Sequence, residues 1–473
     1  MKIILSEHIL DLLDFAIKYG MELGADFIES RAENIRRMYI HFEKDLVKNV
    51  ESINWVGIGI TAIFKNARGY GFTTKLDKES IKEAVKNAVE IAKASTKIAG
   101  ISSEPIEYKP QEYSGKIPSV RKHPRDFSLE DKIDLALSGI KEVLSNDVIS
   151  LRTVYGEYWG EKYFMNSEGL KRQWNPIMVG LFYAVVVREN GKIGNGREQM
   201  SASMGLELFD EHRPESIAKT ALRGAREALE AKTLESGKYP FIASPEFSGV
   251  LAHESFGHLT EGDYVATGAS ILAGKLNQQL GSEQVYIYDS GDPVNYGFWV
   301  PYDDEGVDAR RVTLLEKGIL VGYLHARSTA KIMNMAPTGN ARAINYRFPP
   351  IVRMRNTYFG AGDATKEELF EMIKKGVYAE GHAGGQTEDT GNFTFAANRA
   401  YWVENGEIKF PLKAVVVRGH ILDFLKNVIG ASKDVIVKTS ILGGCGKGGQ
   451  APLPVGLGGP YLAVKEAIIS FGK

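Results

Sequence analysis

The chain has 473 residues, of which 44% are hydrophobic and 25% charged, and its formal net charge is −1. This composition is typical of a globular protein with two or three domains and excludes a disordered or low-complexity chain. A charge near zero gives no general electrostatic basis for nucleic-acid binding, and a single cysteine excludes an intrachain disulfide.

The sequence predicts no membrane segment. Acidic residues at Glu7, Asp11 and Asp14 interrupt the first apolar stretch, which therefore does not resemble a signal peptide. The longest apolar run, Ile177 to Val187, is too short to span a bilayer. Because a lone cysteine also suits a reducing compartment, we expect a cytoplasmic protein.

The first unit, residues 1–98, combines helical and strand periodicity. Apolar residues recur at helical spacing from Ile9 to Ile17, and a second helical stripe follows Asp77. Between them the period changes to two, which predicts strands near 26–32, 37–44, 55–64 and 68–74. The expected order is α-β-β-β-β-α.

Residues 99–127 are rich in proline and read as a surface linker, whose basic cluster at 121–125 is more typical of a solvated segment than of a nucleic-acid site. The first pattern then recurs over 128–232. A helix capped by Ser128 precedes a hairpin signal at Asn190-Gly191, and a closing helix begins near Pro214. Strands are predicted near 148–158, 161–166, 176–188 and 197–207. We interpret the two units as a diverged duplication.

Residues 237–473 predict a mostly β C-terminal domain, so the whole chain is α+β. Short strand candidates alternate with glycine turns, and Glu316-Lys317-Gly318 and Glu404-Asn405-Gly406 are typical of hairpin tips. The few expected helices lie near 246–257, 328–333, 365–376 and 421–428. We expect a barrel or sandwich-like fold that carries a metal-site helix and brings the two ends of the domain together.

The metal site is predicted by His253, Glu254 and His258 on the apolar segment 246–257. Two histidines flanking a glutamate are the arrangement by which metallopeptidases hold Zn²⁺ and place a general base beside it. The five-residue spacing is unusual, because it separates the histidines by roughly 140° on an ideal helix. A π-turn or a helix end at Gly257 is therefore expected.

A catalytic zinc site needs three protein ligands and an open position. Cys445, in the glycine-rich run 443–449, is the first choice for the third ligand, and His382 is the second. The run is not a P-loop, because Lys447 is followed by glycine and Ile441 occupies the position of the first glycine. A structural zinc, or buried histidines and a buried cysteine without metal, remain alternatives. Asp303, Asp304 and Glu305 are more typical of a turn than of a second metal site.

A set of short motifs extends this pattern through the C-terminal domain: His253-Glu254-Ser255-Phe256-Gly257-His258 with Glu261-Gly262-Asp263, Asp303-Asp304-Glu305-Gly306, Pro337-Thr338-Gly339-Asn340, Arg353-Met354-Arg355-Asn356-Thr357-Tyr358, Gly384-Gly385-Gln386 and Gly444-Cys445-Gly446-Lys447. Together they resemble the TldD branch of the TldD/PmbA family. Leu259-Thr260 departs from the Gly-Leu that the family prefers.

The resemblance implies a zinc metallopeptidase that acts on small or unfolded peptides, with His253, His258 and Cys445 as ligands and Glu254 as the catalytic base. It also implies an assembly of two chains that enclose a chamber, either a homodimer or a heterodimer with a PmbA-like (TldE) paralogue lacking the metal motif. This chain keeps the motif and would be the active subunit.

Candidate substrate-binding residues are Arg353, Arg355, Asn356, His382 and the stretch Gly384-Gly385-Gln386. They would hold a peptide backbone along an exposed strand edge, although an Arg-x-Arg pair is also typical of a solvated strand face. Two other functions remain open: a non-catalytic chamber that binds or unfolds peptides around a structural zinc, and a cysteine nucleophile at Cys445 with a histidine base.

Overall fold

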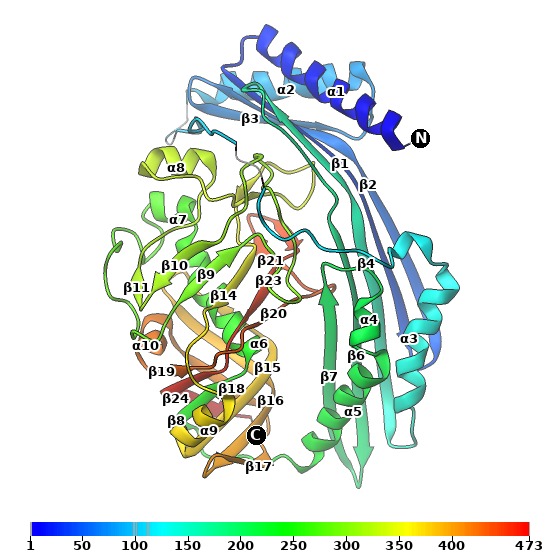
Figure 1. Cartoon of the computed structure of the whole chain (residues 1–473), viewed down its shortest axis with the longest axis vertical. Helices are drawn as coiled ribbons and strands as arrows, with labels where there is room; N and C mark the ends of the chain where they lie inside the picture. Colours follow the sequence, from blue (N-terminus) through cyan, green and yellow to red (C-terminus); the bar gives the residue numbers. More distant parts are fainter. Residues whose placement is uncertain (1, 98–99, 101, 111–112, 473) are drawn as a thin grey trace.

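The computed structural model describes residues 2–97, 100, 102–110 and 113–472. A long antiparallel sheet spans the N-terminal half, and a closed barrel with a second sheet forms the C-terminal half (Figure 1). This architecture confirms the predicted α+β class and the barrel in the C-terminal half.

The N-terminal sheet joins both α/β units, because β1 of the first pairs antiparallel with β4 of the second. Its strand order is β3-β2-β1-β4-β6-β7, with β5 paired to β4. The strands are β1 (Phe27–Glu43), β2 (Leu46–Phe64), β3 (Ala67–Thr73), β4 (Val148–Asn166), β5 (Lys171–Trp174), β6 (Ile177–Glu189) and β7 (Lys192–Ala202).

The strand bounds differ from the predicted ones in several places: β2 begins at Leu46 and not near 55, β7 spans Lys192–Ala202 and not 197–207, β5 was not predicted, and the first unit has three strands in place of four. The largest differences are two mergers. The segments 26–32 and 37–44 form the single strand β1, and 148–158 with 161–166 form β4. Polar residues interrupt the apolar alternation of β1, but they are buried against the C-terminal half. Glu33, for example, is 3% exposed and its carboxylate accepts a hydrogen bond from the Tyr346 N–H at 3.1 Å. The polar stretch therefore marks a domain contact and not a turn.

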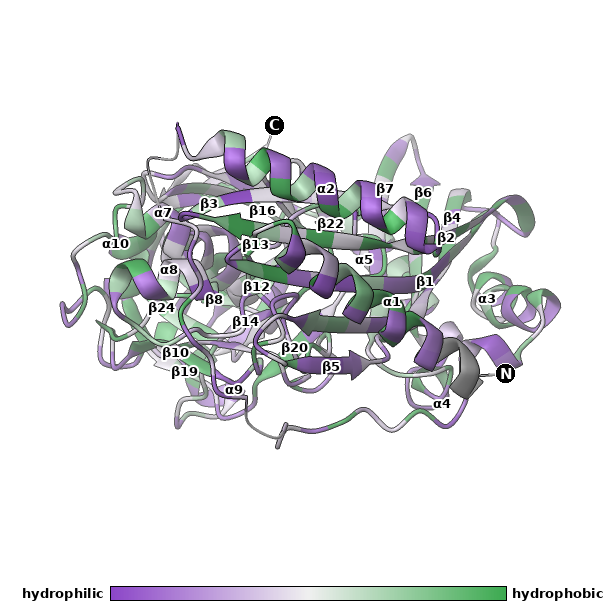
Figure 2. Cartoon of the chain, turned by 90° about the horizontal axis from the view of Figure 1, so that it is seen from above, coloured by the Kyte–Doolittle hydropathy of each residue, from purple (hydrophilic) through white to green (hydrophobic). Residues whose placement is uncertain are grey.

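Helices cover one face of this sheet, and each buries an apolar stripe there. Helices α1 (Lys2–Glu22) and α2 (Lys78–Ser95) lie side by side over β1 to β3 (Figure 2). Helices α3 (Leu129–Val143) and α5 (Pro214–Glu230) pack on β4, β6 and β7, and the short α4 (Leu208–Glu211) precedes α5. The predicted capping of α3 is confirmed, because Ser128 and Asp131 form a reciprocal capping box.

The opposite face of the sheet packs on the C-terminal half through Ile35, Tyr158 and Met178, which contact Phe298 and Ile441 among others. Buried ion pairs join the same surfaces. The Asp304 carboxylate lies 2.8 Å from the Lys162 ammonium and 3.3 Å from the Arg31 guanidinium. Asp303 accepts backbone N–H groups of Glu305 and Val307. The acidic run 303–305 therefore forms a turn, as predicted.

The described part of the linker lies along both halves. Tyr108 and Tyr113 donate hydrogen bonds to Asp308 and Asp292 of the C-terminal half, and the Arg327 guanidinium donates to the Ile106 carbonyl at 2.6 Å. A short 3₁₀ turn, η1 (Pro124–Asp126), precedes α3. The predicted boundary at 98/99 falls outside the described residues.

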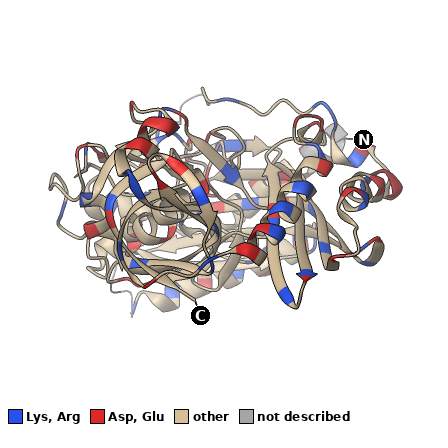
Figure 3. Cartoon of the chain, turned by 90° about the horizontal axis from the view of Figure 1, so that it is seen from below, with Lys and Arg blue, Asp and Glu red and all other residues tan. Residues whose placement is uncertain are grey.

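The barrel closes because β15 pairs with both β8 and β16. Seen from below, it forms a ring of five strands in the order β15-β8-β24-β18-β16 (Figure 3). These strands are β8 (Gly237–Ala243), β15 (Lys375–Thr387), β16 (Asn392–Glu404), β18 (Val415–His420) and β24 (Leu462–Phe471), extended by β17 (Glu407–Pro411) and β19 (Val428–Ala431).

A second sheet, β11-β10-β9-β14-β23-β20, lies beside the barrel. Its strands are β9 (Ile287–Ser290), β10 (Val312–Glu316), β11 (Ile319–Leu320), β14 (Asn356–Phe359), β20 (Ile436–Thr439) and β23 (Gly456–Gly459), with two small hairpins, β12 (Ala341–Arg342) with β13 (Ile351–Val352) and β21 (Cys445–Lys447) with β22 (Gln450–Leu453). Both predicted tips are confirmed, since Lys317-Gly318 and Asn405-Gly406 have positive φ.

The helices of this half are α6 (Pro245–Val250), α7 (Gly262–Ala266), α8 (Arg327–Met333), α9 (Lys366–Ile373) and α10 (Ile421–Lys426). Helix α6 packs between the barrel strand β15 and β23 of the second sheet. A Cβ at Gly249 would lie 2.2 Å from the Gly458 nitrogen, so glycine is required for this close approach. Within the described ranges, no helix is both long and apolar enough to cross a membrane.

Candidate metal centre

The segment that carries the two histidines is a distorted helix. Helix α6 begins after Ser244, whose hydroxyl accepts the Phe247 N–H at 3.3 Å, and continues into a π-helix, η2 (Leu251–Gly257), and a 3₁₀ turn, η3 (His258–Thr260). The His258 N–H donates to the His253 carbonyl. This i→i+5 bond places the two histidines one wide turn apart, and the predicted distortion is confirmed.

Gly257 acts here through its size and not through its backbone freedom. Its φ of −57° and ψ of −48° are those of an ordinary helix. A Cβ at this position would lie 2.1 Å from the Met354 sulfur. The absence of a side chain therefore lets the π-helix pack directly on the segment that precedes β14.

The structure brings His253, His258 and Cys445 together. One ligand atom from each lies within 4.8 Å of the others. The His258 Nε2 is 3.4 Å from the Cys445 sulfur, and the two imidazole rings are nearly perpendicular, with centroids 5.4 Å apart. Ligand atoms of one tetrahedral zinc ion lie roughly 3.5 Å apart, so the separation of His258 and Cys445 matches such a site and the three side chains lie close enough to converge on one ion.

Cys445 is delivered by the hairpin of β21 and β22. Gly448 and Gly449, with φ of 57° and 74°, form its tip. The Arg353 guanidinium donates to the Cys445 carbonyl at 2.7 Å and to the Gln450 carbonyl at 3.1 Å, which ties both strands to the core. The sulfur is therefore held in place by groups beyond the two imidazoles.

Burial and charge favour the metal-binding form of the cysteine. Burial alone would raise the pKa of the Cys445 thiol, but the neighbouring His253 and His258 outweigh it and hold that pKa well below its usual range. The pKa values of the two imidazoles shift in the opposite direction. Burial opposes protonation, yet Cys445 raises the pKa of His253, and Glu261 with Cys445 raises the pKa of His258 well above its usual range.

These residues fit a zinc ion. His253 is 1% exposed, and neither of its ring nitrogens has a hydrogen-bond partner in the described part of the chain. Buried polar atoms without partners are costly, and a metal bond would satisfy one of them. Two imidazoles and a thiolate are the nitrogen and sulfur donors that zinc prefers, and three protein ligands leave a fourth position open.

Glu261 fixes the orientation of His258. Its carboxylate is fully buried and lies 3.0 Å from the His258 Nδ1, which leaves Nε2 to face Cys445. The Lys447 ammonium, two residues beyond Cys445, lies 3.0 Å from the same carboxylate and donates to Asp263 at 2.7 Å. Carboxylates that hold a ligand histidine raise its basicity and set its tautomer. The hairpin thus supplies both the thiol and the counter-charge for this carboxylate.

Replacing Glu261 by Gln is expected to weaken zinc binding by roughly 10- to 100-fold, because a neutral amide holds His258 less strongly. Competition with a chromophoric chelator measures the dissociation constant directly. Glu368→Gln, which alters an exposed cap of helix α9, is the control. An unchanged zinc affinity in Glu261→Gln would show that the carboxylate does not tune the site.

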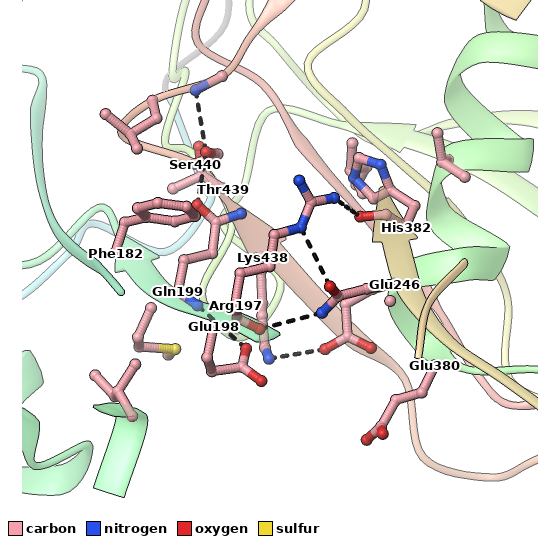
Figure 4. A pocket seen from close by; sticks show the side chains of 18 of the residues that line it. Phe182, Arg197, Glu198, Gln199, Glu246, Glu380, His382, Lys438, Thr439 and Ser440 are labelled. Atoms are coloured by element: carbon pink, nitrogen blue, oxygen red, sulfur yellow. Dashed lines mark hydrogen bonds and ion pairs between the residues drawn. The ribbon is translucent and has the colours of Figure 1, made fainter. Parts of the chain in front are cut away.

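Glu254 lies at the edge of the cluster and opens onto a cavity. Its carboxylate is 3.8 Å from the His258 Nε2, and its side chain is 36% exposed. The cavity has a volume of about 680 Å³ and is lined by residues of β7, α5, α6, β15 and the segment leading to Cys445 (Figure 4). His253, Glu254 and Cys445 all line it. The metal-ligand cluster and the Glu254 carboxylate therefore face the same cavity.

Comparison with known proteins places this site in a family. Three family models match in order along the chain: PmbA/TldA metallopeptidase domain 1 over residues 29–92, the central domain over 122–229 and the C-terminal domain over 236–470. The chain belongs to the PmbA/TldD family. The resemblance found in the sequence motifs is thereby confirmed.

Relatives in this family share most of their length with the chain. A metalloprotease of Methanocaldococcus jannaschii is 34% identical over 93% of this chain and 96% of its own. A zinc metalloprotease TldD homolog of Saccharolobus solfataricus is 31% identical over 95% of this chain and 98% of its own. The crystal structure of TldE from Thermococcus kodakarensis, 20% identical, covers 97% of this chain and all of its own with a TM-score of 0.77. This last likeness shows the shared fold.

Three residues that the sequence suggested for substrate binding lie in the core of this PmbA/TldD family member. Arg353, Arg355 and Asn356 are each 0% exposed, and none of them lines the cavity. Arg355 pairs with Asp289 at 2.6 Å. The Asn356 amide donates to the carbonyls of Ser290 and Phe298 at 2.8 and 2.7 Å. Their hydrogen-bonding groups are used within the fold, so we assign them a structural role.

His382 and the glycine stretch lie nearer to the metal centre. His382 lines the cavity and interacts electrostatically with Glu254, but the metal-ligand cluster contains Cys445 in its place. Gly384, Gly385 and Gln386 are exposed on β15. There β15 pairs with β16 across a bulge, whereas its pairing with β8 ends at Ala379. This part of β15 therefore presents a strand edge without a partner strand among the described residues.

Sequence reasoning assigned no role to Glu261, Lys447 or Arg197. A signal existed for Glu261, because a carboxylate three residues beyond His258 reaches the same side of a helical turn. The other two had no local signal, since their roles depend on contacts between segments far apart in the sequence.

Proposed function

We propose that the chain is a zinc-dependent peptidase that hydrolyses peptide bonds in small or unfolded peptides. The observation that carries this proposal is that the His253, His258 and Cys445 cluster and the Glu254 carboxylate open onto the same cavity. A purely structural zinc site is closed by four protein ligands, whereas this cluster offers three, and the Glu254 carboxylate lies beside it without being one of the three.

His253, His258 and Cys445 would hold the ion, which supplies a Lewis acid that activates water for attack on a carbonyl. Glu254 then acts as the general base. Its carboxylate takes a proton from the attacking water and returns it to the leaving amine, the role expected of a carboxylate within hydrogen-bond reach of the reacting water. Glu261 and Lys447 keep His258 oriented while the charge at the centre changes.

The free edge of β15 supports a peptide substrate. Residues 383–386 are exposed and follow His382, which lines the cavity, and on the side of β8 their strand edge has no partner strand among the described residues. An extended peptide can pair with such an edge as an added strand, which gives affinity without requiring a particular side chain. His382, on the same strand, would lie close to the bond to be cleaved. A cavity of about 680 Å³ admits an extended segment but no folded domain.

A second chain would complete a chamber around this site. The outer part of β2 is an exposed edge strand, because β3 pairs only with Ile58 to Phe64. It carries Leu46 and Val50, which are 61% and 39% exposed. Apolar residues on a free strand edge favour association with another chain.

We propose that the chain forms a homodimer or a heterodimer with a PmbA-like paralogue. We also propose that it works in the cytoplasm, where its thiol stays reduced. Light scattering on the purified chain tests the homodimer, which would have twice the mass of the single chain.

Chelation tests the proposed function. Removing zinc is expected to abolish cleavage of an unfolded protein such as reduced casein, and adding back one equivalent of Zn²⁺ is expected to restore it, because the reaction needs the ion. Mass spectrometry of the peptide products measures the result. Loss of thermal stability on chelation without any cleavage by the zinc-loaded chain would instead favour a peptide-binding chamber with structural zinc.

A further inference from the structure

Four cationic side chains line the cavity, and three of them have a carboxylate partner. Arg399 lies 3.1 Å from Glu198 and 2.9 Å from Glu380, and Lys438 lies 2.8 Å from Glu246. Arg223, on α5, is 3.9 Å from Glu227. Arg399 and Lys438 carry two positive charges against the three lining carboxylates of Glu198, Glu246 and Glu380, so neither cation is free to bind an anionic ligand.

Arg197 is the exception. Its guanidinium donates from Nε to the Asn398 side-chain oxygen at 3.2 Å and from Nη2 to the His382 carbonyl at 2.5 Å, and both acceptors are uncharged. Among the described residues, no carboxylate lies within ion-pair distance of Arg197, and Nη1 has no hydrogen-bond partner. Figure 4 shows this guanidinium beside His382, with its remaining nitrogen directed away from both acceptors.

The surroundings of Arg197 make an anionic ligand favourable. Burial lowers the pKa of Arg197, whereas carboxylates raise the pKa of Lys438 even though burial opposes this. A partly buried cation without a counter-ion costs free energy, and a carboxylate in the cavity would offset that cost through a two-pronged contact.

Arg197 is also close to the metal centre. It contacts His382, which interacts electrostatically with His253 and Glu254. Two residues further along β7, Gln199 accepts a hydrogen bond at 2.8 Å from Ser440, at the start of the segment that leads to Cys445. The guanidinium therefore lies on the wall between β15 and the Cys445 segment, within the space that a bound peptide would occupy.

We propose that Arg197 binds a carboxylate of the peptide substrate and so favours substrates that place an anionic group beside His382. The inference rests on the proposed peptidase function. A peptide offers this group either as its C-terminal carboxylate or as an aspartate or glutamate side chain, and both have the same chemistry.

Binding to the full-length, zinc-loaded Glu254→Gln chain tests the proposal without requiring cleavage. The probes are three versions of one fluorescent octapeptide: one with a free C-terminus and an internal glutamate, one amidated at the C-terminus, and one that is amidated and also has glutamine in place of the glutamate. Arg197→Gln is expected to weaken binding of the first peptide by roughly 10- to 100-fold, the range for a hydrogen bond to a charged group.

The peptide that lacks the recognised carboxylate should bind equally well with and without Arg197→Gln. The change that makes binding insensitive to Arg197→Gln, either amidation or the glutamine substitution, identifies the carboxylate that Arg197 binds. Arg197→Lys should recover part of the affinity because it keeps the charge but loses the fork. Arg223→Gln removes a paired cation of the same cavity and should change binding by less than about twofold.

Equal weakening of all three peptides by Arg197→Gln would overturn the proposal, because it would show a purely structural role through His382 and Asn398. An unchanged affinity for all three would overturn it as well.

Cleavage assays on the same peptides separate this inference from the proposed function. If the wild type cleaves all three equally, only the Arg197 assignment fails, and if none is cleaved while binding depends on the carboxylate, only the peptidase assignment fails.

Discussion

Replacing Glu254 by Gln is expected to lower the rate of peptide hydrolysis by roughly 10²- to 10⁴-fold while leaving zinc bound. The amide keeps the size of the side chain but cannot accept the proton of the attacking water. Glu254 lies outside the metal-ligand cluster, so the ion should keep its three ligands. The measurement is turnover of an unfolded peptide beside zinc content by elemental analysis.

Glu211→Gln is the matched control for this experiment. It makes the same change at an exposed glutamate that lines the same cavity, and its turnover should equal that of the wild type. Full-rate cleavage by Glu254→Gln would exclude this residue as the general base. Loss of zinc together with activity would instead place Glu254 among the groups that hold the ion.

Cys445→Ser is expected to weaken zinc binding more than Glu261→Gln does. It removes a metal ligand, whereas Glu261→Gln changes only a group that orients one. A neutral hydroxyl is a poor substitute for a thiolate on zinc. The wild type should be stabilised by bound zinc, by about 2.7 kcal/mol when free zinc is 100 times its dissociation constant. The Cys445→Ser chain should show little such stabilisation. Thermal unfolding with and without chelator measures the difference.

His382→Ala is the control for the ligand assignment, and it should keep its zinc and its chelator-sensitive melting temperature. Alkylation tests the competing role of Cys445 as a nucleophile. A zinc-bound thiolate should be protected from iodoacetamide and become reactive after chelation. Rapid alkylation and inactivation of the zinc-loaded chain would contradict the ligand role and favour cysteine catalysis.

Much of this site could be predicted because its chemistry is local in the sequence. On an ideal helix the five-residue spacing of His253 and His258 would keep them from binding one ion, which predicts either a π-turn or a helix end, and the structure has a π-helix at Leu251–Gly257. Cys445 could be chosen because no other cysteine exists in the chain. The hairpin signals at Asn190 and Asn405 depend on the positive φ that asparagine tolerates, and both lie at such turns.

The burial of two arginines and a neighbouring asparagine could not be predicted in this way. Arg353, Arg355 and Asn356 read as polar residues on a strand, and an exposed face is the usual place for such residues. They are buried because most of their partners, including Asp289 and the main-chain carbonyls of Ser290 and Gln450, come from segments more than 40 residues away in the sequence. Sequence patterns identify a polar residue but not the distant groups that satisfy it.

The same limit applies to β1 and to Arg197. Polar residues such as Glu33 interrupt the alternation of β1, and only the contact with the C-terminal half explains why the strand continues. Arg197 has no carboxylate partner among the described residues. The absence of a partner can be recognised only when the neighbours of a side chain are known.

The pairing of β8 with β24 has a consequence for biosynthesis. The barrel begins at Gly237 but closes only through Leu462–Phe471, and the histidine segment lies directly after β8. During translation His253 and His258 therefore emerge from the ribosome long before β24, which closes the barrel, and before the hairpin that carries Cys445. Since domains acquire their structure as units during translation, an unfinished polypeptide should lack the assembled cluster of His253, His258 and Cys445.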